Sequence, residues 1–132
     1  MMRNLILCLF AGTLLLGACK EDLDPREEVH DQLVGEWEVE SFTVDGVESI
    51  GTFIQSFEME YTKQDAFTGE TEWTVIDGVG TTTRQESDYT IEAEGREIDI
   101  DGDDLDITIV GDDLTLSGNV DGDRWVIEAE RD

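Results

Sequence analysis

Carboxylates dominate the side chains capable of chemistry in this sequence, because 34 of its 132 residues are Asp or Glu. General acid–base catalysis needs two carboxylates held in different environments within one cleft. Glu58 and Glu60 lie two residues apart on a strand-like segment, so both face the same solvated side. Glu128 and Glu130 repeat this arrangement. We therefore predict no catalytic residues and no enzymatic activity.

The nucleophiles and metal ligands that other chemistries require are scarce. The sequence holds one histidine, His30, and two cysteines, Cys8 and Cys19. A metal or thiol site needs several such groups together, so we predict no metal centre and no cofactor. His30 has no clustered partner in the sequence, and we expect it to lie exposed on a short helix.

Two acidic turns form the one pattern that suggests cation binding. The segment Gly102-Asp103-Asp104-Leu105 recurs as Gly111-Asp112-Asp113-Leu114. Calcium-binding repeats of parallel β-rolls need more glycines than either copy contains. We therefore predict two acidic hairpin tips, with weak cation binding at these turns as the alternative.

The charge balance excludes some partners. Eight Lys and Arg residues against the acids give a formal net charge of −26, whereas nucleic-acid binding needs a basic face. The acidity has two interpretations. In the first, the acidity is an adaptation to saline surroundings, in which salt screens the repulsion between the carboxylates. In the second, it forms a docking face for a cationic partner or divalent ions. Acids on nearly every predicted outer strand face favour the first, which predicts a melting temperature that rises with salt.

The N-terminal segment has the features of a secretion signal. Arg3 precedes an apolar run over 5–16, too short for a membrane-spanning helix, and small residues follow at 17–18. The stretch Leu16-Gly17-Ala18-Cys19 resembles the lipobox of bacterial lipoproteins. This resemblance implies cleavage before Cys19 and lipid attachment to its thiol, which would anchor the protein in a membrane. The alternative is an ordinary signal peptide with a chance cysteine.

The lipobox resemblance also implies a location. We expect a lipid-anchored protein of the outer membrane of a Gram-negative cell. Lys20 does not fit the rule in which Asp after the cysteine retains a lipoprotein in the inner membrane. A Lys followed by acids resembles the export tag of surface lipoproteins, so a periplasmic and a surface-exposed orientation both stay open.

The elements that position the remaining residues are predicted to be almost entirely strands. Asp24, Pro25 and Glu27 have the pattern of a helix start, so we predict a short helix over 25–34. From Gly35 onward apolar and polar residues alternate, which is typical of half-buried antiparallel strands. Asp-Gly pairs at 45–46, 77–78, 101–102 and 121–122 predict tight hairpins between them. We predict an all-β fold in which an up-and-down antiparallel meander of about eight strands closes into a small barrel, with a two-sheet sandwich as the alternative.

One further motif narrows the choice of fold. Leu33-Val34-Gly35-Glu36-Trp37 resembles the opening Gly-x-Trp motif of lipocalin-like proteins. That family often places a basic residue of the last strand over this tryptophan, and Arg131 is the residue that the resemblance assigns to Trp37. The lipobox and Gly-x-Trp resemblances together imply a signal peptide at 1–18, a lipidated cysteine, acidic tether and short helix at 19–32, and a lipocalin-like barrel at 33–132. No C-terminal helix follows the last strand, unlike in full lipocalins.

Aromatic side chains of inward parity are the candidates for a ligand cavity: Phe53, Phe57, Tyr61, Trp73, Tyr89 and Trp125. An eight-stranded barrel can hold one small molecule, or its side chains can fill it completely. A void above about 300 Å³ would favour a ligand. We predict a monomeric, lipid-anchored envelope protein that binds or carries a small apolar ligand. The alternative is a filled barrel that acts on an unidentified protein partner through its acidic outer surface.

Overall fold

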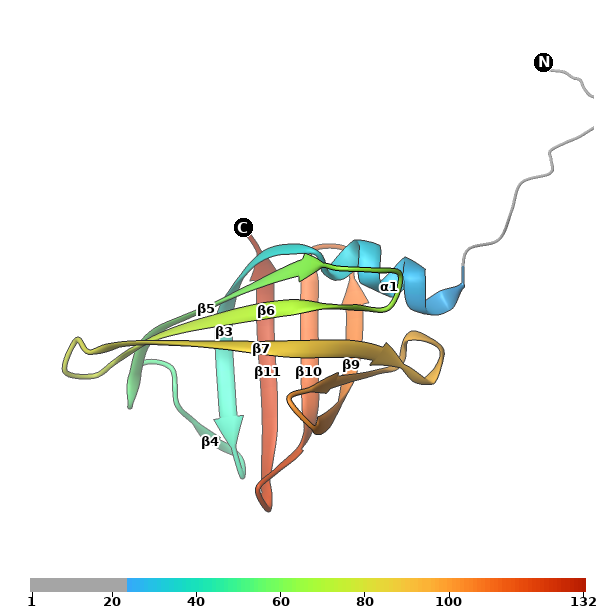
Figure 1. Cartoon of the computed structure of the whole chain (residues 1–132). Coiled ribbons are helices and arrows are strands. Elements are labelled where there is room, and N and C mark those ends of the chain that lie inside the picture. The colour runs from blue at the N-terminus through green and yellow to red at the C-terminus, as the bar shows by residue number, and fades with distance from the viewer. Residues whose placement is uncertain (1–23) are drawn as a thin grey trace, which may run out of the picture.

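The structure is a computed structural model that describes residues 24–132. These residues form a closed antiparallel barrel (Figure 1) in the sheet order β11-β10-β9-β8-β7-β6-β5-β3-β4, with β11 also paired with β3. The elements are α1 (Pro25–Leu33), β3 (Gly35–Val44), β4 (Val47–Glu48), β5 (Ile54–Lys63), β6 (Thr68–Asp77), β7 (Thr82–Glu92), the 3₁₀ turn η1 (Ala93–Gly95), β8 (Glu97–Ile100), β9 (Asp103–Val110), β10 (Asp113–Val120) and β11 (Asp123–Arg131). The predicted eight-stranded up-and-down barrel is confirmed, with β4 as a short extra strand beside the end of β3. The β11–β3 pairing excludes the two-sheet sandwich.

Three of the four predicted Asp-Gly hairpins have the expected geometry. Asp45, Asp101 and Asp121 adopt φ values of 52°, 54° and 53°, and the glycine after each also has a positive φ. Such pairs form the primed turns whose twist matches that of the flanking strands. The connection after Asp77 is longer, and the Asp77 carboxylate accepts hydrogen bonds from the N–H groups of Val79 and Thr81 at 3.0 and 2.9 Å.

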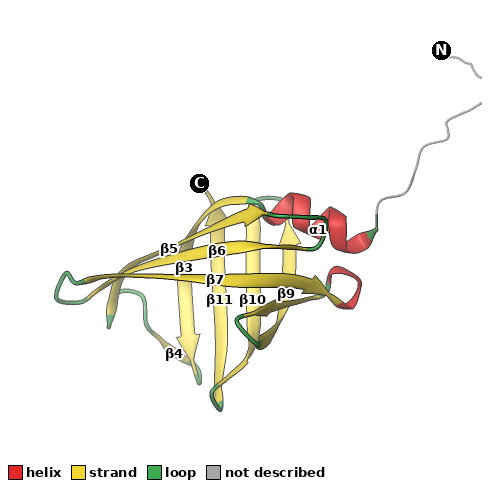
Figure 2. Cartoon of the chain, in the orientation of Figure 1, coloured by secondary structure: helices red, strands yellow, loops and turns green. Residues whose placement is uncertain are grey.

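The helix α1 covers one end of the barrel, which we call the closed end. The Asp24 carboxylate caps it by accepting a hydrogen bond from the N–H of Arg26 at 2.9 Å. Both helical segments, α1 and η1, lie at this end (Figure 2), and Gly95 of η1 approaches the Pro25 carbonyl so closely that a Cβ would come within 2.7 Å. The strand connections β3–β4, β6–β7, β8–β9 and β10–β11 surround the opposite end, which we call the open end. The predicted helix is confirmed, although it ends at Leu33.

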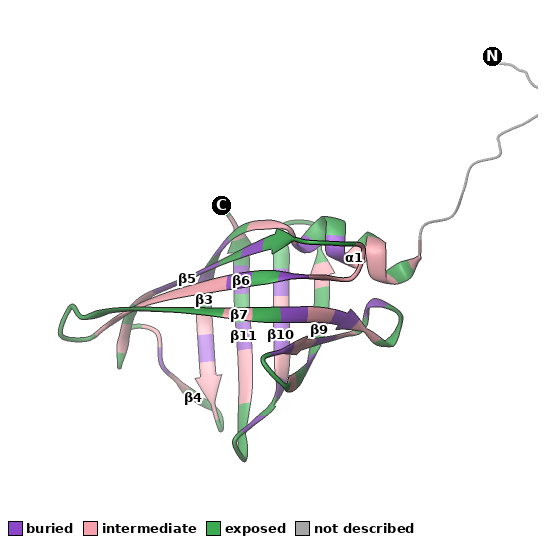
Figure 3. Ribbon diagram, in the orientation of Figure 1, coloured by how far each residue is buried: buried purple, intermediate pink, exposed green. Residues whose placement is uncertain are grey.

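The core fills the closed half of the barrel. The largest fully buried side chains are Trp37, Tyr61, Tyr89, Phe57, Leu33 and Met59. The β6–β7 connection at the open end is exposed along its length (Figure 3), and Val79 at its tip is 87% exposed. Burial is therefore concentrated near α1 and decreases toward the open end.

His30 is fully buried, which corrects the expectation that it would lie exposed. Its Nδ1 lies 3.0 Å from the carbonyl oxygen of Ala66, and its Nε2 lies 2.7 Å from the hydroxyl of Tyr89. The same hydroxyl donates a hydrogen bond to the carbonyl of Thr62 at 2.9 Å. The helix face that carries His30 and Leu33 packs into the barrel end, so the imidazole ties α1 to β7 and to the β5–β6 loop.

The outer wall carries like charges directly opposite one another. Glu60 of β5 lies opposite Glu36 of β3 and Glu72 of β6, and Glu72 in turn lies opposite Glu86 of β7. These four residues form one stripe across four strands, which we call the glutamate stripe. Like charges opposite one another destabilise a sheet, and salt screens exposed charges.

We expect Glu60→Gln to raise the melting temperature at low ionic strength, because it removes two facing repulsions at once. The gain should shrink in molar sodium chloride, where the Debye length is about 3 Å. Thermal unfolding followed by circular dichroism at both salt concentrations measures it. Glu128→Gln is the matched control, because Glu128 lies opposite the uncharged Thr115 and Ser41. An equal gain in both variants at low salt would contradict the pairwise explanation.

Candidate functional site

A pocket of about 290 Å³ opens at the open end of the barrel. Its apolar walls come from Trp73, Ile100, Leu105, Val120 and Trp125, and its polar lining from Gln85, Ser87, Asp101, Asp103 and Asp121. Six strands, β6 to β11, and two turns therefore contribute to one concave site. Its volume lies just below the range of ordinary ligand pockets, about 300–1,000 Å³, and so just short of the void that we set as favouring a ligand.

The predicted cavity residues fall into three groups. Trp73 and Trp125 line the pocket. Phe57, Tyr61 and Tyr89 are buried in the packed core and do not line it. The interior is thus packed at the closed end, and the pocket occupies part of the open end, where Ile100, Leu105 and Val120 are also buried. Each of the two alternatives for the barrel interior therefore describes part of it.

Phe53 was predicted inside the barrel, and this prediction is wrong, because its side chain is 62% exposed. The residue precedes β5, and the pairing of β5 with β6 shifts register between Ile54 and Ser56. A bulge of this kind moves every earlier side chain to the other face. The Phe53 carbonyl instead accepts a hydrogen bond from the N–H of Gly78 at 2.9 Å, joining two connections at the open end.

An aromatic chain crosses the barrel between the core and the pocket. The ring centroids of Trp125 and Phe42 lie 5.0 Å apart, those of Phe42 and Phe57 5.6 Å, and those of Phe57 and Trp73 5.4 Å. All three pairs meet edge to face, which is a favourable aromatic geometry. The two tryptophans of the pocket are therefore held by rings that are themselves buried.

Two polar groups beside the core have no hydrogen-bond partner among the described residues: the Thr71 hydroxyl and the Trp73 indole N–H. Thr71 is almost completely buried, and the neighbouring Tyr61 hydroxyl donates to the sulfur of Met59 at 3.4 Å. Burial raises the pKa of Tyr61, and the Trp73 and Thr71 groups beside it partly oppose this shift. Buried polar groups without partners are uncommon in folded proteins.

The rim of the pocket is acidic. Asp101, Asp103 and Asp121 line the pocket from the β8–β9 and β10–β11 hairpins. Asp45 and Asp123 add further carboxylates in the connections of this end, and the proximity of Asp45 raises the pKa of Asp123. Among the described residues, none of those lining the pocket is a Lys or Arg.

The rim is held in shape near β4 by a carboxylate. The Glu48 side chain accepts hydrogen bonds from the Ser41 hydroxyl at 2.6 Å, the Phe42 N–H at 2.8 Å and the Ile50 N–H at 3.1 Å. These donors, the Ser41 hydroxyl above all, lower the pKa of Glu48. Glu48 thereby satisfies one backbone N–H of β3, where that strand diverges from β5, and one of the segment after β4.

The structure brings Trp37 and Arg131 together at the closed end, away from the pocket. The guanidinium carbon of Arg131 lies 4.3 Å from the centroid of the Trp37 ring. The indole N–H of Trp37 donates to the Leu33 carbonyl at 2.8 Å, and Arg131 donates to the carbonyls of Gln32 and Val34. These contacts join the first and last strands to the end of α1. Trp37 and Arg131 therefore belong to the packing of the closed end and do not line the pocket.

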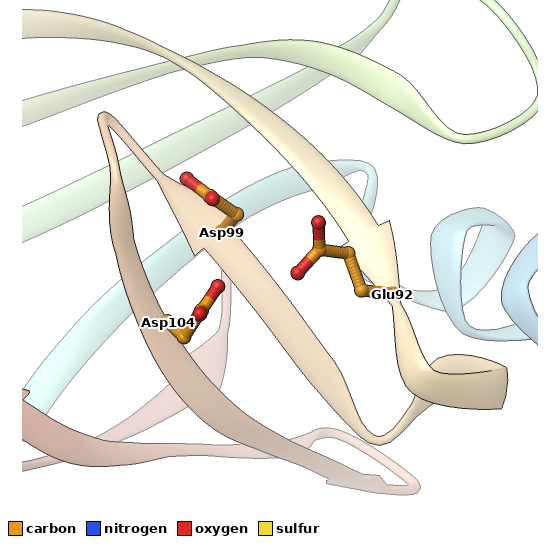
Figure 4. A group of neighbouring side chains, drawn as sticks. All are labelled: Glu92, Asp99 and Asp104. Atoms are coloured by element: carbon orange, nitrogen blue, oxygen red, sulfur yellow. The ribbon is translucent and has the colours of Figure 1, made fainter.

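An acidic cluster on the outer wall is the place where a cation could be held. Glu92, Asp99 and Asp104 come from β7, β8 and β9 and point toward one another (Figure 4), with ligand oxygens within 4.8 Å of one another. Partial burial, followed by repulsion from Asp104, raises the pKa of Glu92. Asp104 belongs to one of the two predicted acidic turns, but only carboxylates meet here, and exposed acidic groups of this kind are common without an ion.

Glu92→Gln and Glu48→Gln are expected to change stability in opposite directions at neutral pH. The raised pKa of Glu92 means that its charge destabilises the folded state, so Glu92→Gln should stabilise the protein. That gain should disappear below pH 4.5, the ordinary value, where the wild-type carboxyl is protonated in both states. The lowered pKa of Glu48 means that its charge stabilises the fold above pH 4.5, so Glu48→Gln should destabilise.

Urea unfolding of the two variants and the wild type between pH 4 and 7 measures both effects. The cost of Glu48→Gln should be constant above pH 4.5 and begin to decrease only below it, because the unfolded wild type is protonated there before the folded protein is. Two variants that shift the unfolding midpoint in the same direction at pH 7 would contradict these assignments.

Other predicted features lie elsewhere. Cys19, the signal peptide over 1–18 and the tether fall outside the described residues. Glu58 and Glu60 are exposed on the outer wall, as are Glu128 and Glu130. Within residues 24–132, no helix combines the length and apolar character that crossing a membrane requires.

Sequence reasoning did not find the polar half of the pocket. Gln85 and Ser87 lie on the first part of β7, ahead of Tyr89, which is the one residue of this strand that we named as a cavity candidate. Residues 82–86 are polar and exposed on both faces, so no alternating pattern marks them as a strand. The signal that could have revealed residues 82–86 as a strand is their pairing with the neighbouring strand β6, in which Trp73 lies opposite Gln85.

No protein-family model matches the sequence, and no curated protein is significantly similar to it. A redesigned β-barrel matches the structure with a TM-score of 0.59 and 16% identity, over 79% of this chain and 95% of that one. A second redesigned β-barrel, bound to DFHBI, has a TM-score of 0.56 and 15% identity, over 75% and 98% of the two chains. A lipocalin lipoprotein affecting virulence in Streptococcus pneumoniae has a TM-score of 0.42 and 13% identity, over 72% and 89%.

The fold of this chain is a small closed antiparallel β-barrel. The two redesigned barrels share its closed antiparallel architecture. In this chain a short helix precedes the first strand, and an arginine of the last strand stacks on the first-strand tryptophan. At these identities the similarity concerns the fold alone.

Proposed function

We propose that this protein binds one small, largely apolar molecule in the pocket at the open end of the barrel and catalyses no reaction. The observation that carries the proposal is a pocket of about 290 Å³ with two tryptophans in its walls. Pockets for small molecules are concave and combine apolar walls with polar groups that orient the ligand. This pocket has both, with five apolar and five polar lining residues. The filled-barrel alternative fits less well, because the side chains at the open end leave this pocket between them.

The pocket limits the size of the ligand. An apolar cavity of about 150 Å³ holds benzene, so about 290 Å³ suits a molecule with one or two fused rings. A long acyl chain would need the space that Phe57, Tyr61 and Tyr89 occupy. The ligand is therefore a compact molecule rather than a membrane lipid.

We also propose that lipid on Cys19 anchors the protein in the outer membrane of a Gram-negative cell. The lipobox resemblance supports this proposal, since two or three acyl chains give stable anchoring. The described chain enters the barrel through α1 at the closed end, which is opposite the pocket. A short tether there would leave the pocket facing away from the membrane.

Native mass spectrometry tests the binding proposal. The full chain is incubated with a small-molecule and lipid extract of the producing cells, and we expect one discrete, stoichiometric added mass. Val120→Trp should abolish it, because Val120 lines the pocket. Val110→Trp is the control, since Val110 is 70% exposed on the outer wall. A compact wild-type protein without added mass would refute the proposal.

The mass of the mature protein purified from cells tests the anchor. We expect a chain that begins at Cys19 and carries acyl chains, and a Cys19→Ser variant released into the soluble fraction. A mature mass without acyl chains would overturn this part of the proposal. Protease treatment of intact cells then distinguishes a surface-exposed domain, which is cleaved, from a periplasmic one, which is protected.

A further inference from the structure

We propose that the pocket selects an organic cation, a small amine with an aromatic or apolar body, and rejects carboxylates of the same size. This inference rests on the proposed ligand binding and names the chemical class of the ligand. The arrangement that carries it is a pocket with tryptophan walls whose rim holds three aspartates.

The walls suit a cation with an apolar body. Trp73 and Trp125 both line the pocket, and tryptophan is the aromatic side chain that attracts cations most strongly. The chain of rings through Phe42 and Phe57 holds the two indoles in place, so little ordering is needed when a ligand binds. Ile100, Leu105 and Val120 supply the apolar contact for the body of the ligand.

The rim supplies the opposite charge. Asp101, Asp103 and Asp121 face the pocket with no Lys or Arg among the described lining residues. The two arginines nearest in sequence are Arg84, beside Gln85, and Arg124, beside Trp125. Both are exposed, and strand alternation places them on the outer face. The aspartates of the rim are thus left without a basic side chain of the pocket to neutralise them.

The same arrangement rejects anions. A cleft lined by one sign of charge with apolar walls concentrates its field, which attracts ligands of opposite charge and excludes those of like charge. A carboxylate ligand would bring a fourth negative charge to the rim while it loses its own hydration. The neutral polar groups of Gln85 and Ser87 cannot compensate for this.

Three matched probes test the inference by isothermal titration calorimetry on the full chain: 1-naphthylmethylammonium, 1-naphthylmethanol and 1-naphthoate. They share one fused ring system of the size that the pocket admits. We expect the ammonium to bind at least about tenfold more tightly than the alcohol at low salt, and the carboxylate to bind more weakly than both. The preference should decrease as salt is added.

Rim variants locate the effect. Asp101→Asn and Asp121→Asn should each weaken ammonium binding severalfold and leave the affinity for the alcohol unchanged. Both aspartates have a positive φ of 54° and 53°, which asparagine tolerates, so the hairpins should be retained. Asp113→Asn is the matched control, because Asp113 is an exposed residue beside the β9–β10 turn at the closed end.

The outcomes separate this inference from the proposed function. Equal affinities of the three probes overturn the charge selection and leave the binding function supported. A failure of all three probes to bind overturns both. An equal loss of ammonium binding in Asp113→Asn and the rim variants would assign the effect to the net charge of the whole protein and refute the role of the rim.

Discussion

Replacing Trp37 by alanine is expected to lower the free energy of unfolding by about 3–5 kcal/mol. The side chain is fully buried at the closed end, and its removal leaves a large cavity between α1 and the barrel. The substitution also removes the hydrogen bond that the indole N–H donates to the Leu33 carbonyl. In addition, it removes the ring on which the Arg131 guanidinium stacks. Urea unfolding of the full chain, followed by circular dichroism, measures the change.

Two further variants separate the parts of this effect. Trp37→Phe keeps most of the buried ring and loses the indole N–H, so it should cost less than Trp37→Ala. Arg131→Met keeps much of the stacked side-chain length and removes the hydrogen bonds to Gln32 and Val34. Its cost should be smaller in the Trp37→Ala background, because the stacking of the guanidinium on the indole is already lost there, whereas the two hydrogen bonds remain to be lost. An unchanged unfolding midpoint for Trp37→Ala would show that the closed end does not depend on this residue.

The barrel could be predicted from the sequence because most of its strands have one solvent-exposed face and one buried face. Alternation shows such strands directly, and Asp-Gly pairs mark the turns between them. The first part of β7 could not be predicted in this way, because residues 82–86 are polar and solvent-exposed on both faces of the strand. That part of β7 also forms the wall of the pocket at the open end. Because its inward-facing side chains are polar and not packed in the core, the alternating pattern is missing where the pocket forms.

The other two errors have tertiary causes. Phe53 has the right parity for an inward residue, but a register shift after Ile54 turns it outward, and no local pattern encodes that shift. His30 has no sequence neighbour that could bind it. Its partners, Ala66 and Tyr89, come from segments 36 and 59 residues away. Long-range packing of this kind overrides the expectation that a polar residue on a short helix is exposed.

Gly69→Ala is expected to cost about 3 kcal/mol or more, although alanine usually suits a strand better than glycine does. Gly69 pairs with Lys63 on one side and with Tyr89 on the other. A Cβ at this position would lie 1.9 Å from the carbonyl oxygen of Thr62 and 2.6 Å from the hydroxyl of Tyr89. Gly69 thus leaves the space through which the Tyr89 hydroxyl reaches both Thr62 and His30.

The clash should therefore loosen α1 as well as the sheet. When Tyr89 moves, His30 loses its partner inside the barrel, and hydrogen exchange of the Val34 N–H, which bonds to the His30 carbonyl, should accelerate. Gly78→Ala is the matched control, because its Cβ would meet ordinary contacts of 3.6 Å or more and its cost should be near zero. Adding Tyr89→Phe to Gly69→Ala should restore only part of the stability, since the backbone oxygen of Thr62 still blocks the new methyl group. Complete restoration of stability would assign all of the strain in Gly69→Ala to the Tyr89 hydroxyl. Equal losses of stability in Gly69→Ala and Gly78→Ala would show that the close approach of Thr62 and Tyr89 to Gly69 is unimportant.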